Sequence, residues 1–298
     1  MAEQQRVIGV DLGGTKILAG VVGADGTIEV SRERPTPLDS QDALLSALDE
    51  AIEELVDDGI AALGFGIPSR VDPQTGRAAG SVNIPLAELD FDDRMKDRFG
   101  LPVGVDNDAN AAAFAEWRRG AGHGARTLVM LTLGTGVGAG FVLDGRLYRG
   151  WAEAGHIVVV HDGKPCPCGG RGHLESYCRG PAADEAAREA FGPSSSSREL
   201  VRLADEGDER AREVLAGLGR ILGSGIGSLV NLFAADRVVI GGGFGTAAFH
   251  HLVDPALEVA RREALPPADE LLEVVRAELG GEAGLIGAGL VAFEALAM

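Results

Sequence analysis

Residues 11–16, DLGGTK, place an acid, two glycines, a hydroxyl and a lysine between two apolar runs. Gly13 and Gly14 allow backbone conformations closed to other residues and leave no side chain between the turn and a ligand. Successive N–H groups in a tight turn can form an anion-binding concavity, to which Thr15 adds a hydroxyl and Lys16 a charge. Asp11 is suited to hold a divalent cation beside that anion. Alone, the stretch is equally typical of an ordinary β-hairpin.

The same pattern recurs in the middle of the chain. Thr132 and its following leucine align with Asp11 and Leu12, an offset of 132 − 11 = 121 residues, and each copy ends at an Asp-Gly pair. This repeat predicts two similar halves, each with a strand–turn–strand phosphate grip. The second grip contains Gly134, Thr135 and Gly136. Its G-x-G-x-x-A spacing is not a dinucleotide fingerprint, because a strand and a turn follow where that motif needs a helix.

A third glycine cluster, residues 241–243, follows an apolar strand at 238–240. Glycines at this place would let an adenine and a ribose lie flat against the backbone. A plain tight turn explains the cluster equally well.

Asp108 is the candidate general base. It lies in residues 107–110, NDAN, directly after the strand expected at 102–105. Ligands of open α/β folds commonly bind at the carboxyl ends of strands, where a carboxylate can accept the proton of an attacking hydroxyl. Asn107 and Asn110 can bind hydroxyls beside it. The alternative is that Asp108 caps the following helix.

Four metal-ligating residues lie within a short segment: His156, Cys166, Cys168 and His173. Zinc in structural sites usually takes four Cys and His ligands. Two alternatives stay open, namely that the thiols are idle, or that Cys178 replaces His173. An odd total of three cysteines argues against a disulfide framework.

These residues must be positioned by alternating strands and helices. We expect a helix at 41–58 capped by Ser40, strands at 62–67 and 102–105, and an alanine-rich helix ending near 119. This alternation predicts an α/β architecture. The break at 120–124 divides an N-terminal domain, 1–119, completed by a C-terminal helix at 284–298, from a second domain, 120–283, which carries the Cys/His loop at 156–178.

The net charge of −18 over 298 residues argues against nucleic-acid binding. An anionic substrate must therefore be captured by local groups rather than by long-range steering. No apolar run long enough for a membrane span and no signal peptide are expected, which predicts a soluble, cytoplasmic protein without a membrane partner.

Taken together, DLGGTK at 11–16, NDAN at 107–110, LGTGVGAG at 133–140, EAGH at 153–156 and CPCGGRGHLE at 166–175 resemble the motifs of the ROK family of sugar kinases, repressors and open reading frames. The match runs the length of the chain in the family's order. The resemblance implies an actin-like ATPase (ribonuclease H-like) fold: two α/β domains, each with a mixed five-stranded sheet, and a cleft between them that closes over a sugar and a nucleotide.

The resemblance also implies roles for individual residues. Asp108 matches the base that deprotonates the sugar hydroxyl, commonly the 6-hydroxyl, and Asp11 would lie near the magnesium ion of ATP. The other matching positions contact the sugar (Asn83, Asn107, Glu153, His156 and Glu175), the phosphates (Gly13, Gly14, Thr15, Lys16, Gly134, Thr135 and Gly136) or the adenosine (Gly242 and Gly243). His156 would bind zinc with one ring nitrogen and face the sugar with the other.

The activity implied is ATP-dependent phosphorylation of a hexose, first of all glucose to glucose 6-phosphate. The alternatives are another sugar (N-acetylmannosamine, N-acetylglucosamine, fructose or allose), polyphosphate as donor, or a sugar-responsive regulator, which the six residues before Val7 disfavour. A homodimer or homotetramer is expected. Two departures from the family concern His173, where a third cysteine is usual, and Pro68-Ser69, where Pro-Gly is typical.

Overall fold

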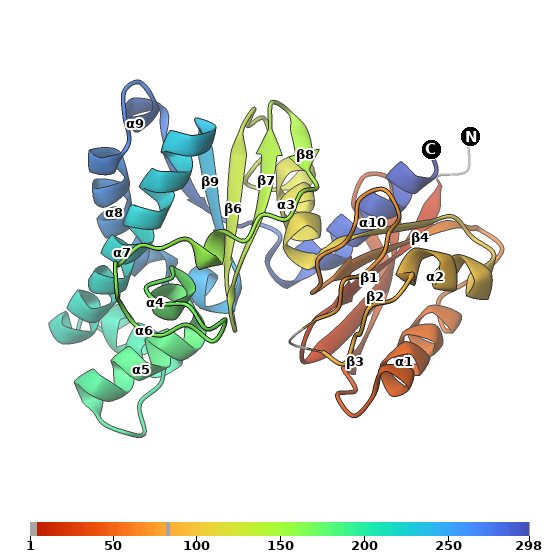
Figure 1. The fold of residues 1–298 in the computed structure, drawn as a ribbon, viewed down its shortest axis with the longest axis horizontal. Coiled ribbons are helices and arrows are strands. Elements are labelled where there is room, and N and C mark those ends of the chain that lie inside the picture. The colour runs from red at the N-terminus through yellow and green to blue at the C-terminus, as the bar shows by residue number, and fades with distance from the viewer. Residues whose placement is uncertain (1–4, 82–83, 298) are drawn as a thin grey trace. The chain divides into compact units, whose positions relative to one another are not determined.

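The computed structural model describes residues 5–81 and 84–297 (Figure 1). The chain forms two compact units. Unit 1 comprises Met1–Arg119, Leu147–Trp151 and Glu282–Met298, and unit 2 comprises Gly120–Arg146 and Ala152–Gly281. Each unit contains a five-stranded sheet and its own hydrophobic core.

The sheet of unit 1 has the strand order β3-β2-β1-β4-β5. Its strands are β1 (Arg6–Leu12), β2 (Lys16–Gly23), β3 (Ile28–Pro35), β4 (Ile60–Ile67) and β5 (Val103–Asn107). Strands β1 to β3 form an antiparallel meander, whereas β4 and β5 run parallel to β1. The carboxyl ends of β1, β4 and β5 therefore meet at one edge of the sheet.

Helices cover both faces of this sheet. They are α1 (Gln41–Glu53), α2 (Phe91–Phe99), α3 (Asp108–Arg119) and α10 (Ala283–Ala295). Ile8 and Val10 of β1 share a buried cluster with residues of α1 and α2. On the other side α10 comes unusually close, because a Cβ on Gly9 would lie 2.5 Å from the carbonyl oxygen of Leu285. Glycine in the strand thus permits a helix backbone to rest directly on the sheet.

The sheet of unit 2 repeats this plan, with the order β10-β9-β6-β7-β8. Its strands are β6 (Leu128–Leu133), β7 (Val137–Leu143), β8 (Arg146–Tyr148), β9 (Arg237–Gly241) and β10 (Glu273–Arg276). Strands β6 and β7 are antiparallel, and β9 runs parallel to both β6 and β10, as the corresponding strands do in unit 1. The mixed five-stranded sheet expected in each half is confirmed.

Unit 2 is the more helical of the two. Its helices are η1 (Ala154–His156), α4 (Glu175–Cys178), α5 (Gly180–Phe191), α6 (Ser197–Asp205), α7 (Glu209–Phe233), α8 (Gly243–Glu263), α9 (Ala268–Leu271) and η2 (Gly280–Glu282). Helices α7 and α8 pack tightly along their length. A Cβ on Gly223 of α7 would lie 2.3 Å from the carbonyl oxygen of Ala256 in α8, so the glycine sets how closely the two helices approach.

Helix α7 is long and apolar enough, by length and composition alone, to cross a membrane. Among the described residues it is the one helix that passes this test, which a single core helix of a protein without a membrane span also passes. Half of its most apolar window is buried inside the structure, and its Leu215, Leu222 and Ile226 belong to the core of unit 2. A core helix passes the same test, and packing explains the apolar character of α7.

The first helix begins as predicted and ends early. Ser40 caps α1, because its Oγ accepts a hydrogen bond of 3.1 Å from the N–H of Ala43. The helix ends at Glu53, before the expected residue Asp58. In the turn that follows, the carboxylate of Asp57 accepts from the N–H of Gly59 at 2.8 Å. Local bonds of this kind compete with the helix for the backbone.

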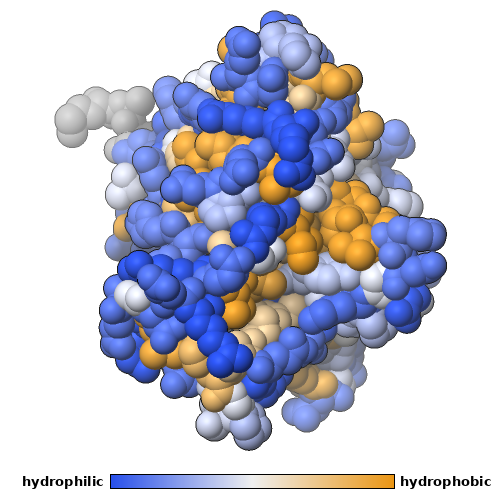
Figure 2. Space-filling view, turned by 90° about the vertical axis from the view of Figure 1, so that its left-hand side faces the viewer, coloured by the Kyte–Doolittle hydropathy of each residue, from blue (hydrophilic) through white to orange (hydrophobic). Residues whose placement is uncertain are grey.

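Most of the surface seen in Figure 2 is hydrophilic, with smaller hydrophobic patches between the polar side chains. Acidic residues outnumber basic ones, 45 to 27, in agreement with that surface.

Candidate functional site

The first glycine turn lies between β1 and β2 of unit 1. The N–H of Gly13 donates to the carbonyl oxygen of Lys16 at 2.9 Å, which closes the turn. Thr36, which follows β3, braces it from the side: its Oγ1 donates to the carbonyl of Gly13 at 2.7 Å and its N–H to that of Thr15 at 3.1 Å. Thr36 is buried, and no motif in the sequence pointed to it.

Asp11 is the last residue but one of β1. Burial raises the pKa of Asp11 to about 7; the charge of Asp108 raises it as well, while Lys16 opposes the shift. The two predicted carboxylates thus lie close enough to repel each other. Two acids held together in this way favour a bound cation, which would relieve both the burial and the repulsion.

Hydrogen bonds to the side chain of Asn107 stabilise the turn that carries Asp108. The side-chain oxygen of Asn107 accepts from the N–H groups of Ala109 at 2.9 Å and Asn110 at 3.2 Å. This is the bonding pattern of a helix N-cap, so the cap of α3 is Asn107 rather than Asp108. The amide nitrogen of Asn107 also donates to the carbonyl of Ser69 at 3.3 Å.

Asn110, expected to bind a hydroxyl, is buried and supports the turn instead. Its Nδ2 donates to Oδ1 of Asp106 at 2.9 Å. The same oxygen accepts from the N–H of Asn107 at 2.8 Å. Asp106 is 3% exposed and was not singled out by the sequence patterns.

The second glycine turn joins β6 and β7 of unit 2. The N–H of Gly134 donates to the carbonyl of Gly136 at 2.9 Å, and Gly134 in turn accepts from Gly180, the first residue of α5, at 2.7 Å. Glu175 supports the turn through its Oε2, which accepts from the N–H of Val137 at 2.9 Å. A Cβ on Gly136 would approach that oxygen to 2.7 Å. Thr135 at the tip is exposed.

The third glycine cluster begins α8. Gly242 has a φ of +78°, and a Cβ there would lie 2.5 Å from the carbonyl oxygen of Leu133. Only glycine therefore fits beside the end of β6. A Cβ on Gly243 would meet nothing within 4 Å. No side chain caps this end of α8, which leaves its first N–H groups available to a ligand.

The Cys/His segment folds into a cluster in unit 2. The ligand atoms of His156, Cys166, Cys168 and His173 all lie within 4.8 Å of one another. Donors about 2.0–2.3 Å from one zinc ion lie within about 4.6 Å of each other, so the four residues fit a single ion after small adjustments. Cys178 lies apart in the core, where burial raises the pKa of its thiol to about 12.

The remaining predicted sugar contacts lie on either side of this cluster in the sequence. Glu153 is exposed and its carbonyl accepts from the N–H of His156 at 2.9 Å, which starts the short helix η1. A Cβ on Gly155 would lie 2.2 Å from the carbonyl of Val137, so η1 rests on β7 just after the second glycine turn. Asn83 lies outside the described residues.

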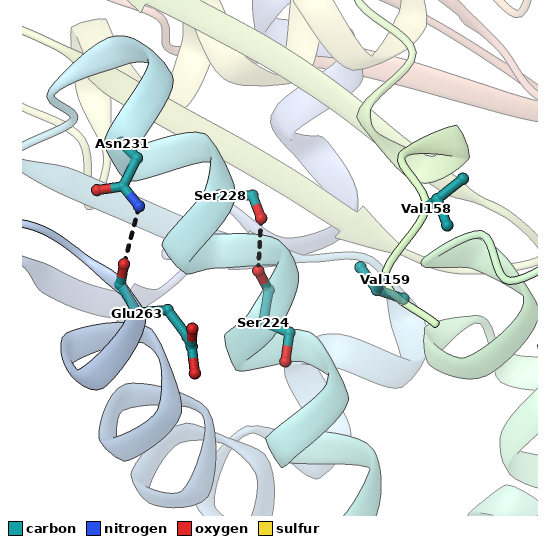
Figure 3. Close-up of a pocket in the computed structure, with 6 residues that line it drawn as sticks. All are labelled: Val158, Val159, Ser224, Ser228, Asn231 and Glu263. Atoms are coloured by element: carbon teal, nitrogen blue, oxygen red, sulfur yellow. Dashed lines mark hydrogen bonds between the residues drawn. The ribbon is translucent and has the colours of Figure 1, made fainter. Parts of the chain in front are cut away.

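A pocket of about 330 Å³ opens elsewhere in unit 2, between α7, the end of α8 and the loop after η1 (Figure 3). The residues that line it are Val158, Val159, Ser224, Ser228, Asn231 and Glu263. Polar groups here bond to the protein itself: Asn231 donates to the carbonyl of Glu263 at 2.8 Å and Ser228 to that of Ser224 at 3.0 Å. None of its lining residues is a predicted site residue.

Comparison with known proteins identifies the family of this chain and several similar sugar kinases. The model of the ROK family matches residues 7–295. The glucokinase of Streptomyces coelicolor is 35% identical over 314 aligned positions, covering 96% of this chain and 97% of that protein. An N-acetylmannosamine kinase of Shigella flexneri is 29% identical, with 96% and 98% covered. The crystal structure of a ROK family glucokinase from Streptomyces griseus, in complex with glucose and AMPPNP, superposes with a TM-score of 0.83 at 34% identity and covers 97% of this chain and 99% of that one.

Proposed function

Since the chain belongs to the ROK family and is a sugar kinase, we propose that it transfers the γ-phosphoryl group of ATP to the 6-hydroxyl of glucose. The 35% sequence identity to a glucokinase over nearly the whole chain supports glucose as the substrate. The glucose bound in the related Streptomyces griseus structure supports it as well. N-acetylmannosamine is the second candidate, because a kinase for it is 29% identical over a similar length.

One observation carries the proposed mechanism. Asp11 lies near the end of β1 and Asp108 directly follows β5. The carboxyl ends of these two strands share one sheet edge, and the charge of Asp108 raises the pKa of Asp11. Asp108 accepts the proton of the sugar hydroxyl as the oxygen attacks the γ-phosphorus. Asn107 caps the first turn of α3 and so fixes the position of Asp108 for this step. The second hydrogen of its amide can donate to a neighbouring sugar hydroxyl.

Phosphate binding is assigned to the main chain of the two glycine turns. The turns formed by Gly13, Gly14 and Thr15 in unit 1 and by Gly134, Thr135 and Gly136 in unit 2 are the proposed phosphate contacts. The N–H groups of Gly13 and Gly134 close the turns, so the N–H groups and hydroxyls of the other residues would face the phosphate oxygens. Lys16 adds a positive charge, and Gly242 and Gly243 leave room for the adenosine. Asp11 would hold a magnesium ion that binds with ATP, and that ion would supply positive charge against the phosphates.

A structural zinc ion is proposed for the cluster of His156, Cys166, Cys168 and His173. The donor set and its spacing suit zinc, and the bound ion would fix the ring orientation of His156. Glu153, His156 and Glu175 are the proposed sugar contacts of unit 2, with Asn83 and Asn107 those of unit 1. Because His156 would contact both the zinc ion and the sugar, folding of the Cys/His loop and binding of the sugar would be coupled.

We place this activity in the cytoplasm, in a homodimer or homotetramer. Three free thiols suit a reducing compartment. Leu232 and Leu265 of unit 2 are 71% and 70% exposed, respectively. Contact with a second copy would remove such apolar surface from water. Light scattering on the purified protein measures the oligomeric state.

The test is a coupled assay that measures ADP formation with a panel of hexoses and ATP, and a parallel assay of sugar phosphate with polyphosphate as donor. Glucose with ATP should give the highest kcat/KM. A higher value for N-acetylmannosamine would reassign the substrate, and turnover of none of the sugars would refute the kinase. Asp108→Asn should lower kcat by about three orders of magnitude or more, while calorimetry still detects glucose binding; near-normal turnover would refute the base.

A further inference from the structure

Arg149 pairs with a buried acid of the proposed catalytic turn. It lies in the segment Leu147–Trp151, which packs as part of unit 1. Its Nε donates to Oδ2 of Asp106 at 2.8 Å, and a second guanidinium nitrogen donates to Oε2 of Glu294 in α10. The side chain of Asp106 is 4% exposed, against 44% for Glu294. The two ion pairs therefore lie in very different surroundings.

Asp106 in turn accepts hydrogen bonds from two residues of the turn that carries the proposed base. While Oδ2 faces Arg149, Oδ1 accepts from the N–H of Asn107 and the amide of Asn110. Those two residues flank Asp108 in the sequence. A buried carboxylate left without its cation strongly destabilises the folded state, and relieving that cost would pull Asp106 away from the turn or let water enter.

A second contact from the same segment reaches the other side of the turn. The ring N–H of Trp151 donates to the carbonyl of Val71 at 3.3 Å, and the guanidinium of Arg70 lies 5.3 Å from the centre of the Trp151 ring. Ser69, one residue before Arg70, accepts the amide hydrogen bond of Asn107. The segment 147–151 thus supports Asn107 through Asp106 on one side and through residues 69–71 on the other.

From these contacts we infer that Arg149 is a positioning residue for phosphoryl transfer, acting through Asp106 on the turn that carries Asp108. The inference rests on the proposed role of Asp108 as base. No motif or comparison assigns a task to position 149. A general base must sit within hydrogen-bond reach of the hydroxyl it deprotonates, and a displacement of about 1 Å can cost about 100-fold in rate.

The test compares four variants: Arg149→Gln, Arg149→Lys, Glu294→Gln and the double variant Asp106→Asn with Arg149→Gln. Arg149→Gln should lower kcat by about 10- to 100-fold, measured well below its Tm, and leave KM for ATP within about twofold. Arg149→Lys keeps a cation beside Asp106 and should recover part of the loss, but not all, because lysine lacks the fork that spans two carboxylates.

Glu294→Gln is the matched control, because it removes the exposed partner of the same arginine. Arg149 keeps its bond to the buried Asp106 there, so kcat should stay within about twofold of wild type. The double variant replaces the buried charge by a neutral amide and should recover Tm relative to Arg149→Gln alone, which shows that an unpaired carboxylate caused the loss.

Hydrogen exchange gives a readout that needs no catalysis. Peptides covering residues 106–112 should exchange faster in Arg149→Gln than in Glu294→Gln. Equal exchange in the two variants, or a wild-type kcat for Arg149→Gln, would overturn the inference. If the wild-type protein phosphorylates no sugar, the proposed function fails, and the exchange of this turn still decides whether Arg149 holds it.

Discussion

The substitution Asp11→Asn should stabilise the nucleotide-free protein at alkaline pH. Burial, the larger cause, and the charge of Asp108 raise the pKa of Asp11 from 3.8 to about 7. Between these values the unfolded chain has lost its proton while the folded chain retains it. The free energy of unfolding therefore falls as pH rises from about 4 to about 7 and remains low above that.

The magnitude follows from the shift. About three pKa units at about 1.4 kcal/mol each give about 4 kcal/mol as an upper bound, because water penetration and the coupled charge of Asp108 reduce it. An asparagine has no charge to bury, so the stability gained by the variant should be small at pH 4 and reach a few kcal/mol at pH 8. Urea unfolding without magnesium or nucleotide, followed by circular dichroism at both pH values, measures this difference.

Asp25→Asn is a control of opposite sign. The N–H of Thr27 donates to the exposed Asp25 carboxylate, which lowers the pKa of that group. Its contribution to stability is present above its unfolded pKa of 3.8 and is lost only as pH falls below that value, through the lowered folded pKa. The substitution should therefore destabilise at pH 8 and nearly as much at pH 4. A gain for Asp11→Asn that is equal at both pH values would refute the account of a buried, charge-repelled acid.

Three further predictions concern the supports of the site. Thr36→Val should lower stability by about 1 kcal/mol and raise KM for ATP, because the carbonyl of Gly13 loses the hydroxyl donor of the buried Thr36; urea unfolding and initial rates measure both effects. Gly136→Ala should lower Tm, since its Cβ displaces the Glu175 carboxylate, whereas Gly134→Ala, where space is open, should not; an equal fall in Tm for both would contradict this reading. Removing the metal with a chelator should lower Tm and raise KM for glucose together, and elemental analysis well below one zinc per chain would count against the site.

Much of the fold follows from local patterns in the sequence. The two glycine turns and the similar order of strands and turns around them predict two sheets of the same kind, since strand alternation and turn residues act over a few positions. The helix beginning at Gln41 was found through Ser40 for the same reason. Helix α2 was not predicted: its nine residues carry only two buried side chains, Phe91 and Met95, too few for a clear period.

The supports of the site depend instead on contacts between distant residues. Thr36 lies 23 residues from Gly13, and Arg149 lies 43 residues from Asp106. Neither belongs to a pattern of spacing, so only the folded chain shows which partner each meets.

Asp11 and Asp106 differ in how the protein compensates the negative charge of each carboxylate. Both are acids at the ends of parallel strands in the same sheet of unit 1. Asp106 pairs with Arg149 and accepts two hydrogen bonds from the turn, so its carboxylate is satisfied within the protein. Asp11 instead meets burial and the charge of Asp108, which together raise its pKa. An acid held at that cost to stability is suited to a cation that arrives with the substrate. Magnesium with a nucleotide should therefore raise the Tm of wild type more than that of Asp11→Asn, and an equal rise in both would assign the cation to other ligands.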